Sequence, residues 1–119
     1  MDAFDFDAAT GSVENRRRFL DLDRELGEGD GMTIDSSGNL WIAVLGSSCV
    51  RCFSPAGVLE EVIELPVSLV TSCAFGGADL GDLYITTAQH RLDRPGPLDG
   101  ALFRCRPGVT GLCSPAYAG

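Results

Sequence analysis

The feature that most constrains the fold of this chain is a group of short apolar stretches, separated by turns, that occurs twice in the same order. Three stretches of the first group match three of the second: Met32-Thr33-Ile34 with Cys73-Ala74-Phe75, Asn39-Leu40-Trp41-Ile42 with Asp82-Leu83-Tyr84-Ile85, and residues 51–55 with residues 103–107. The offset grows from 41 residues at the first match to 52 at the third, because residues 89–100 are an insertion. Short apolar stretches bounded by glycine, proline, asparagine and serine are typical of β-strands.

The first group is complete, and a partial one precedes it. Its four expected strands span residues 31–34, 40–45, 50–53 and 59–65, whereas residues 3–7 and 16–22 resemble the last two strands of a preceding group. A helix around residues 14–20 is a minor alternative. A β-sandwich also has short strands but does not repeat one order of strands and turns. We therefore predict an all-β chain of about two and a half four-stranded β-propeller blades, forming one domain over residues 1–119.

The amino-acid composition limits the class of protein and the kinds of binding partner expected for this chain. The chain has 119 residues, of which 45% are hydrophobic, and a formal net charge of −8. A chain this apolar is not expected to be a disordered tail, and an acidic one lacks the basic surface that nucleic acids and anionic membranes attract. We see no signal peptide and no apolar run long enough to span a bilayer. Five cysteines at irregular spacing do not indicate a disulfide framework, so a reduced, cytoplasmic protein is predicted.

The repeat also predicts open sheet edges. The chain starts in the third strand of one blade and ends about three strands into another, whereas a closed propeller needs at least ~4 blades. We therefore expect either a fragment of a longer protein or a chain completed by a complementary propeller chain or by self-association. By itself it is expected to expose edge strands and apolar blade faces.

Three segments lie in the order and spacing of a known family and cover essentially the whole chain. They are Ala3-Phe4-Asp5-Phe6-Asp7-Ala8-Ala9-Thr10-Gly11, the segment from Asp30-Gly31-Met32-Thr33-Ile34-Asp35 to Gly38-Asn39-Leu40-Trp41-Ile42-Ala43, and the segment from Leu65-Pro66-Val67-Ser68 through Thr71-Ser72-Cys73-Ala74-Phe75-Gly76-Gly77 to Leu83-Tyr84-Ile85-Thr86-Thr87-Ala88. Together they resemble the gluconolactonase/regucalcin (senescence marker protein) family. The resemblance implies the C-terminal part of a six-bladed β-propeller.

Members of this family hydrolyse the ester bond of sugar lactones and use one divalent cation, such as calcium, zinc or magnesium, in the central channel. The resemblance implies that a glutamate, two asparagines and the aspartate of an Asp-Gly-Met turn hold the cation. Only that aspartate maps onto this chain, at Asp30, as metal ligand and catalytic base. The chain departs from the family beside this position, where Gly29 replaces the usual proline, and before Thr71, where Leu69-Val70 replaces the usual His-Pro.

The chain is therefore expected to be a fragment of a divalent-metal-dependent sugar lactone hydrolase that is inactive alone and does not bind the cation tightly. The alternative is a non-catalytic partial propeller that acts as an interaction module or needs a complementary chain.

From the residues alone, Asp30 also has two interpretations. It can bind a hard cation and accept a proton from a metal-polarised water, or it can simply form a turn between two glycines, which is the commoner role.

Two further residues are assigned to a substrate pocket through the repeat. Thr71 holds in its unit the position that Asp30 holds in the preceding unit, so Thr71 and the neighbouring Ser72 are predicted to line the pocket. A purely structural role for Thr71 at the start of an inner strand is the alternative. His90, the single histidine of the chain, is interpreted as a solvated loop residue, because no serine nucleophile motif accompanies it.

The remaining chemically notable residues are interpreted as structural. Cys49 and Cys52 have the spacing of redox and zinc pairs, but residues three apart on a strand face opposite sides. Cys73 and Cys105 fall within strand patterns and are predicted core residues. The three arginines at residues 16–18 are predicted to face solvent from an outer strand.

Overall fold

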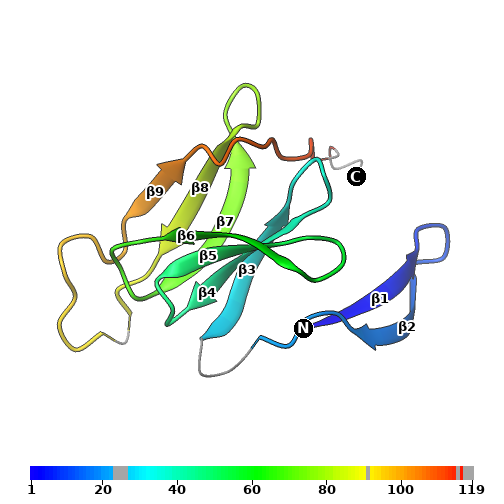
Figure 1. Ribbon diagram of the computed structural model, residues 1–119, viewed down its shortest axis with the longest axis horizontal. Helices are drawn as coiled ribbons and strands as arrows, with labels where there is room; N and C mark the ends of the chain where they lie inside the picture. The colour runs from blue at the N-terminus through cyan, green and yellow to red at the C-terminus, as the bar shows by residue number, and fades with distance from the viewer. Residues whose placement is uncertain (23–26, 91, 115, 117–119) are drawn as a thin grey trace.

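The computed structural model describes residues 1–22, 27–90, 92–114 and 116. All regular elements in these ranges are β-strands, arranged in three antiparallel sheets (Figure 1). The first sheet is a hairpin of β1 (Asp2–Asp7) and β2 (Ser12–Arg18). The second contains β3 (Glu28–Ile34), β4 (Leu40–Leu45), β5 (Cys49–Phe53) and β6 (Leu59–Glu64) in chain order. The third contains β7 (Val70–Gly76), β8 (Asp82–Thr87) and β9 (Leu102–Cys105) in chain order.

Strand pairing confirms the repeat that was read from the sequence. Matched residues occupy matched positions in the two larger sheets: the pair Leu40–Phe53 corresponds to Leu83–Cys105, and the pair Met32–Ile42 corresponds to Cys73–Ile85. The two sheets are therefore copies of one unit, with four strands in the first and three in the second. The prediction of an all-β partial propeller of about two and a half blades is confirmed, and the alternative of a helix around residues 14–20 is wrong.

The first hairpin differs from its predicted boundaries. A strand was expected at residues 16–22, but β2 spans Ser12–Arg18. The chain leaves the hairpin there because the Phe19 and Leu20 amides both donate to the Met1 carbonyl, at 3.1 and 3.2 Å. Leu20 is thereby buried in a small cluster with Ile42 and Phe53 of the second sheet. The three arginines at residues 16–18 face solvent as predicted, and they form ion pairs with aspartates.

The main core lies between the second and third sheets, where β7 packs against β3 and β4. Ten buried side chains form it: Trp41, Ala43, Val50, Cys52, Leu65, Val67, Val70, Cys73, Leu83 and Ile85. Trp41 also meets Phe75 edge to face, with 5.8 Å between the ring centroids. This apolar interface fixes the innermost strand of one blade beside that of the next.

After β9 the chain returns to the preceding blade. The Ser36 amide donates to the Thr110 carbonyl (2.8 Å), and the Gly111 amide donates to the Leu80 carbonyl (2.9 Å). This return segment therefore connects the β3–β4 turn with the β7–β8 turn. Gly111 is buried, and a Cβ atom there would lie 2.3 Å from the Cβ of Phe75. The close contact leaves no room for any side chain at this position.

We expect Gly111→Ala to lower the free energy of unfolding by about 1–3 kcal/mol, the usual cost of overpacking. The Cβ of Phe75 cannot rotate away from the added methyl group, so the return segment or β7 must shift. Urea denaturation followed by tryptophan fluorescence measures the change. Gly96→Ala is the matched control, because its Cβ would meet only the Asp99 carboxylate, at 3.4 Å. Equal losses in both variants would contradict the tight fit at Gly111.

The sheets leave large apolar side chains exposed, as the repeat predicted. On the first hairpin, Phe6 is 68% exposed and Val13 is 61% exposed, and Leu102 of β9 is 65% exposed. β1 and β9 are the outermost strands of their sheets, and Figure 1 shows the hairpin extending away from the other two sheets. Within the described part of the chain, no helix is long and apolar enough to cross a membrane.

Candidate functional site

The innermost strands of the two larger sheets carry the same irregularity. In β3 the pairing register shifts at a bulge that contains Asp30 and Gly31. In β7 the register shifts at the equivalent point, and the additional residue is Thr71. Bulges bend a strand and change the direction of its side chains, which is why they are common beside functional sites. Asp30 and Thr71 therefore lie at equivalent bulges on adjacent strands.

Beside Asp30, β3 and β7 are in direct contact, because Gly31 of β3 has no side chain to separate them. A Cβ atom on Gly31 would lie 2.1 Å from the Oγ of Ser72 and 2.7 Å from its Cα. Ser72 thus occupies the space that a side chain at Gly31 would need. The close approach of the two strands depends on glycine at this position.

A pocket of about 250 Å³ lies where these strands begin. Its polar lining comes from Asp30 of β3, Thr71 of β7 and His90 of the loop after β8. Its aliphatic wall consists of Leu45, Leu69, Ala88 and Leu92. In Figure 1 the starts of β3 and β7 and the end of β8 lie at the same end of the two sheets. The pocket therefore places a carboxylate, a hydroxyl and an imidazole next to an aliphatic wall.

Backbone hydrogen bonds between the two blades and within the second blade hold the aliphatic wall. Leu45, at the end of β4, forms a β-bridge with Leu69, and the Gly46 amide donates to the Ser68 carbonyl at 3.1 Å. The Ala88 amide donates to the Leu69 carbonyl at 2.9 Å. Because these bonds involve only main-chain atoms, substitutions of the side chains in the wall leave the bonds in place.

The structure brings together two of the three residues predicted for the site. Asp30 and Thr71 line the pocket, whereas Ser72 packs beside Gly31 and is not part of the lining. Their roles in binding a metal or a substrate stay predictions. His90 is exposed, as expected of a loop residue, but it also lines the pocket together with Leu92. The sequence did not predict that His90 and Leu92 line this pocket, because the insertion at residues 89–100 has no counterpart in the first repeat.

The pocket does not complete a divalent-cation site. Calcium takes six to eight oxygen ligands and structural zinc takes four ligands, whereas the pocket offers one carboxylate, one hydroxyl and one imidazole. Across residues 1–22, 27–90, 92–114 and 116, no group of three or more His, Cys, Asp or Glu side chains is placed to hold a metal ion. In the described part of the chain, Asp30 is therefore not part of a cluster of such ligands.

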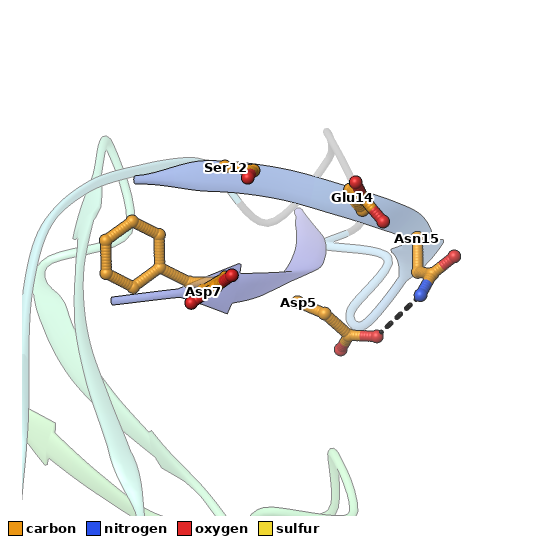
Figure 2. Close-up of a pocket in the computed structure, with 6 residues that line it drawn as sticks. Asp5, Asp7, Ser12, Glu14 and Asn15 are labelled. Carbon is orange, nitrogen blue, oxygen red and sulfur yellow. Dashed lines mark hydrogen bonds between the residues drawn. The ribbon is translucent and has the colours of Figure 1, made fainter. Parts of the chain in front are cut away.

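A second pocket, of about 190 Å³, lies on the β1–β2 hairpin and has carboxylates on both strands (Figure 2). Its Asp5 accepts hydrogen bonds from Asn15 (2.9 Å) and Arg17 (2.7 Å), and these bonds lower the pKa of Asp5. Its Asp7 accepts a hydrogen bond from the Ala9 amide at 2.8 Å, within the turn. These carboxylates stabilise the hairpin, so we do not assign a site to this pocket.

A buried carboxylate, Asp35, lies where β3 joins β4. Asp35 has no exposed surface and accepts four hydrogen bonds of 2.9–3.0 Å, from the Ser37 and Asn39 amides, the Asn39 side chain and the Trp41 indole. Burial by itself raises the pKa of a carboxyl group, but these donors outweigh it and hold the pKa of Asp35 below its ordinary value. Asp35 is therefore an ionised structural group.

The cysteines are structural, as predicted. Cys49, Cys52 and Cys73 are buried, Cys105 is half-buried, and none forms a disulfide. Burial raises the pKa of the Cys52 and Cys73 thiols to about 11, which disfavours the reactive thiolate. Cys52 belongs to the core between the two larger sheets and Cys49 does not, in agreement with opposite orientations on β5. The CxxC spacing is therefore not a redox or metal pair.

Comparison with known proteins identifies the family. Residues 1–89 match the SMP-30/Gluconolactonase/LRE-like region. The chain belongs to this family. Among curated relatives of this SMP-30/gluconolactonase chain, regucalcin of Sus scrofa is 39% identical over 125 aligned positions, and regucalcin of Homo sapiens is 38% identical. Each alignment covers all of the present chain and 42% of the relative, so the chain spans less than half the length of these proteins.

Solved structures of the family superpose on most of the chain. A luciferin-regenerating enzyme is 37% identical with a TM-score of 0.84, and the match covers 93% of this chain and 39% of that one. The calcium-binding protein regucalcin from Agrobacterium tumefaciens is 29% identical with a TM-score of 0.88, covering 98% and 41%. A gluconolactonase from Xanthomonas campestris is 30% identical with a TM-score of 0.60, covering 71% and 26%. These matches support the assignment of the three sheets to propeller blades.

Proposed function

We propose that this chain supplies one part of the site of a divalent-metal-dependent sugar lactone hydrolase, with Asp30 as a ligand of the cation and as the catalytic base. One observation carries the proposal: equivalent bulges on adjacent innermost strands bring Asp30 and Thr71 to the lining of a single pocket. Membership of the gluconolactonase family supports the reaction class.

The chemistry expected of Asp30 is proton transfer. In lactone hydrolysis, water adds to the ring carbonyl carbon, the ring C–O bond breaks, and a hydroxy acid forms. Asp30 is exposed at the pocket, so its carboxylate can take the proton of the attacking water and return it to the departing oxygen. The Thr71 hydroxyl lies 2.8 Å from the Thr86 hydroxyl, and when Thr86 donates in this pair, Thr71 keeps its own proton to donate to a lactone oxygen.

We further propose that these residues alone bind the cation weakly and do not turn over lactones. The pocket provides a single carboxylate, too few ligands for calcium, zinc or magnesium. The cation would therefore need ligands beyond the described residues. The unpaired cysteines support the cytoplasm as the location of the protein.

Calorimetric titration of the purified chain with calcium and with zinc, alongside a glucono-δ-lactone hydrolysis assay, tests this proposal. We expect neither tight one-to-one binding nor turnover. Weak contact should still be visible as paramagnetic broadening by Mn²⁺ of the amide signals around Asp30 and Thr71. The broadening should be lost in Asp30→Asn and retained in Asp93→Asn, which removes an exposed carboxylate outside the pocket lining. Tight binding with turnover would contradict the proposal, and so would Mn²⁺ broadening that is unchanged in Asp30→Asn.

A second candidate function, an interaction module, is favoured by the exposed apolar side chains of the first hairpin. Phe4, Phe6 and Val13 lie there with large exposed fractions, and β1 is an outermost strand. Such a surface favours pairing with another strand or sheet. Light scattering on the same samples distinguishes the two functions, since a chain that associates without binding a cation at Asp30 supports the interaction module.

A further inference from the structure

We propose that the pocket beside Asp30 accepts a short aliphatic substituent of its ligand, so that the preferred lactones carry an alkyl group rather than a hydroxyl on every carbon. This inference rests on the proposed function only for the lactone ring. The preference itself follows from the side chains of the pocket. It keeps the lactone hydrolysis proposed above but changes the expected ring substituent from a hydroxyl to an alkyl group.

Four of the seven described residues that line the pocket are aliphatic. Leu45, Leu69, Ala88 and Leu92 line it, and each is half-buried, with part of its side chain facing the pocket. None of these four side chains can donate or accept a hydrogen bond. The wall therefore offers an apolar ligand group a surface to bury, and it offers a hydroxyl group no partner.

Among the described residues, three polar side chains from three segments line the pocket. Asp30 and His90 are both exposed, and the Thr71 hydroxyl is paired with that of Thr86. A lactone ring can place its ester group against these residues and its substituent against the aliphatic wall. The volume of about 250 Å³ suits a ring with a short chain, since it lies just below the usual range for small-molecule sites.

The physical cost of the wrong substituent is large enough to select between substrates. A hydroxyl buried against aliphatic side chains loses its bonds to water and gains none in return. Burial of a short alkyl chain on the same wall is favourable in proportion to its apolar area. The two effects act in the same direction, so the pocket distinguishes an alkyl lactone from a polyhydroxylated one.

Two of the four wall residues come from different segments of the second blade. Leu69 stands immediately before β7, whereas Leu92 comes from the insertion after β8. The insertion therefore contributes to the pocket wall as well as connecting two strands. This position makes Leu92 a residue through which specificity can be changed without altering a sheet.

Binding of three lactones, followed by amide chemical shifts of the labelled chain, tests the inference without relying on catalysis. The probes are δ-octalactone, which carries a propyl group, the unsubstituted δ-valerolactone, and glucono-δ-lactone. We expect δ-octalactone to bind more tightly than the other two, on the order of tenfold or more, with shifts at Leu69, Ala88 and Leu92. Absence of binding by δ-octalactone, or tighter binding of glucono-δ-lactone, overturns the inference.

Variants of the loop leucines complete the test. Leu92→Asn is expected to remove the preference for δ-octalactone, whereas Leu98→Asn, at an exposed leucine of the same loop, leaves it unchanged. Leu69→Asn provides a second wall variant. An unchanged preference in both wall variants overturns the inference. The cation experiment at Asp30 is evaluated separately. If the lactone preference is found but Asp30-dependent contact with the cation is not, only the proposed function is contradicted. If contact with the cation is found but the lactone preference is not, only the inference is contradicted.

Discussion

Asp35→Ala is expected to cause the largest loss of stability of any substitution considered, at least about 3 kcal/mol in the free energy of unfolding. The substitution removes the acceptor of four hydrogen bonds at once. The Trp41 indole N–H is the most costly of these donors, because Trp41 is buried in the main core and would lose its acceptor there. Small domains have only about 5–15 kcal/mol of stability, so urea denaturation should show a large shift in midpoint.

Asp79→Ala is the matched control for this prediction. Asp79 lies in the corresponding turn of the next blade, between β7 and β8, but its carboxylate is exposed and pairs with Arg106 at the surface. Exposed ion pairs contribute about 0–1 kcal/mol, so the control should lose little stability. Similar losses in the two variants would show that the buried network at Asp35 is not what stabilises the blade.

The charge of Asp35 also predicts a dependence on pH. Its pKa is held below the ordinary value in the folded chain, so the unfolded chain binds the proton more readily. The stabilisation is therefore complete above the ordinary aspartate pKa and is lost as the pH falls through the lower pKa of the folded state. The difference in unfolding free energy between the wild type and Asp35→Asn should shrink as the pH falls below about 4. A constant difference over that window would contradict the ionised state.

Gly31→Ala is expected to have the second largest effect, about 3 kcal/mol of stability, at the upper end of the range for overpacking. The added Cβ would overlap the Oγ, Cβ and Cα of Ser72, and the Cα belongs to the backbone of β7. β3 and β7 must therefore move apart at the bulges that carry Asp30 and Thr71. We expect both a lower urea midpoint and a loss of lactone-induced amide shifts at the pocket.

Ser72→Gly separates these contacts in a double-mutant cycle. It removes the Oγ and Cβ overlaps but leaves the Cα at 2.7 Å from the new methyl group. The double variant should therefore recover part of the stability that Gly31→Ala loses, and the interaction energy should be favourable. Strict additivity of the two single effects would mean that the strands do not approach each other as closely as the structure places them.

Much of the blade architecture could be predicted because it follows from local patterns. The matched triplets at residues 32–34 and 73–75 occupy the same register in their sheets, as their equal apolar character indicated. The differences between the two units were not predictable in the same way. Asp35 of the first unit corresponds to Gly76 of the second, where a Cβ would lie 3.0 Å from the Tyr84 ring. An indole N–H needs a buried acceptor at this position, whereas the tyrosine ring needs the space.

The sequence by itself determined the strand order, the repeat and the equivalence of Asp30 with Thr71, because each follows from short local patterns that recur along the chain. Only the tertiary structure decided the pocket. Leu45, Leu69 and Leu92 come from two blades and an insertion, and no period in the sequence relates them. Packing of β7 against β3 brings these leucines to one wall, since a glycine at residue 31 lets the two strands touch.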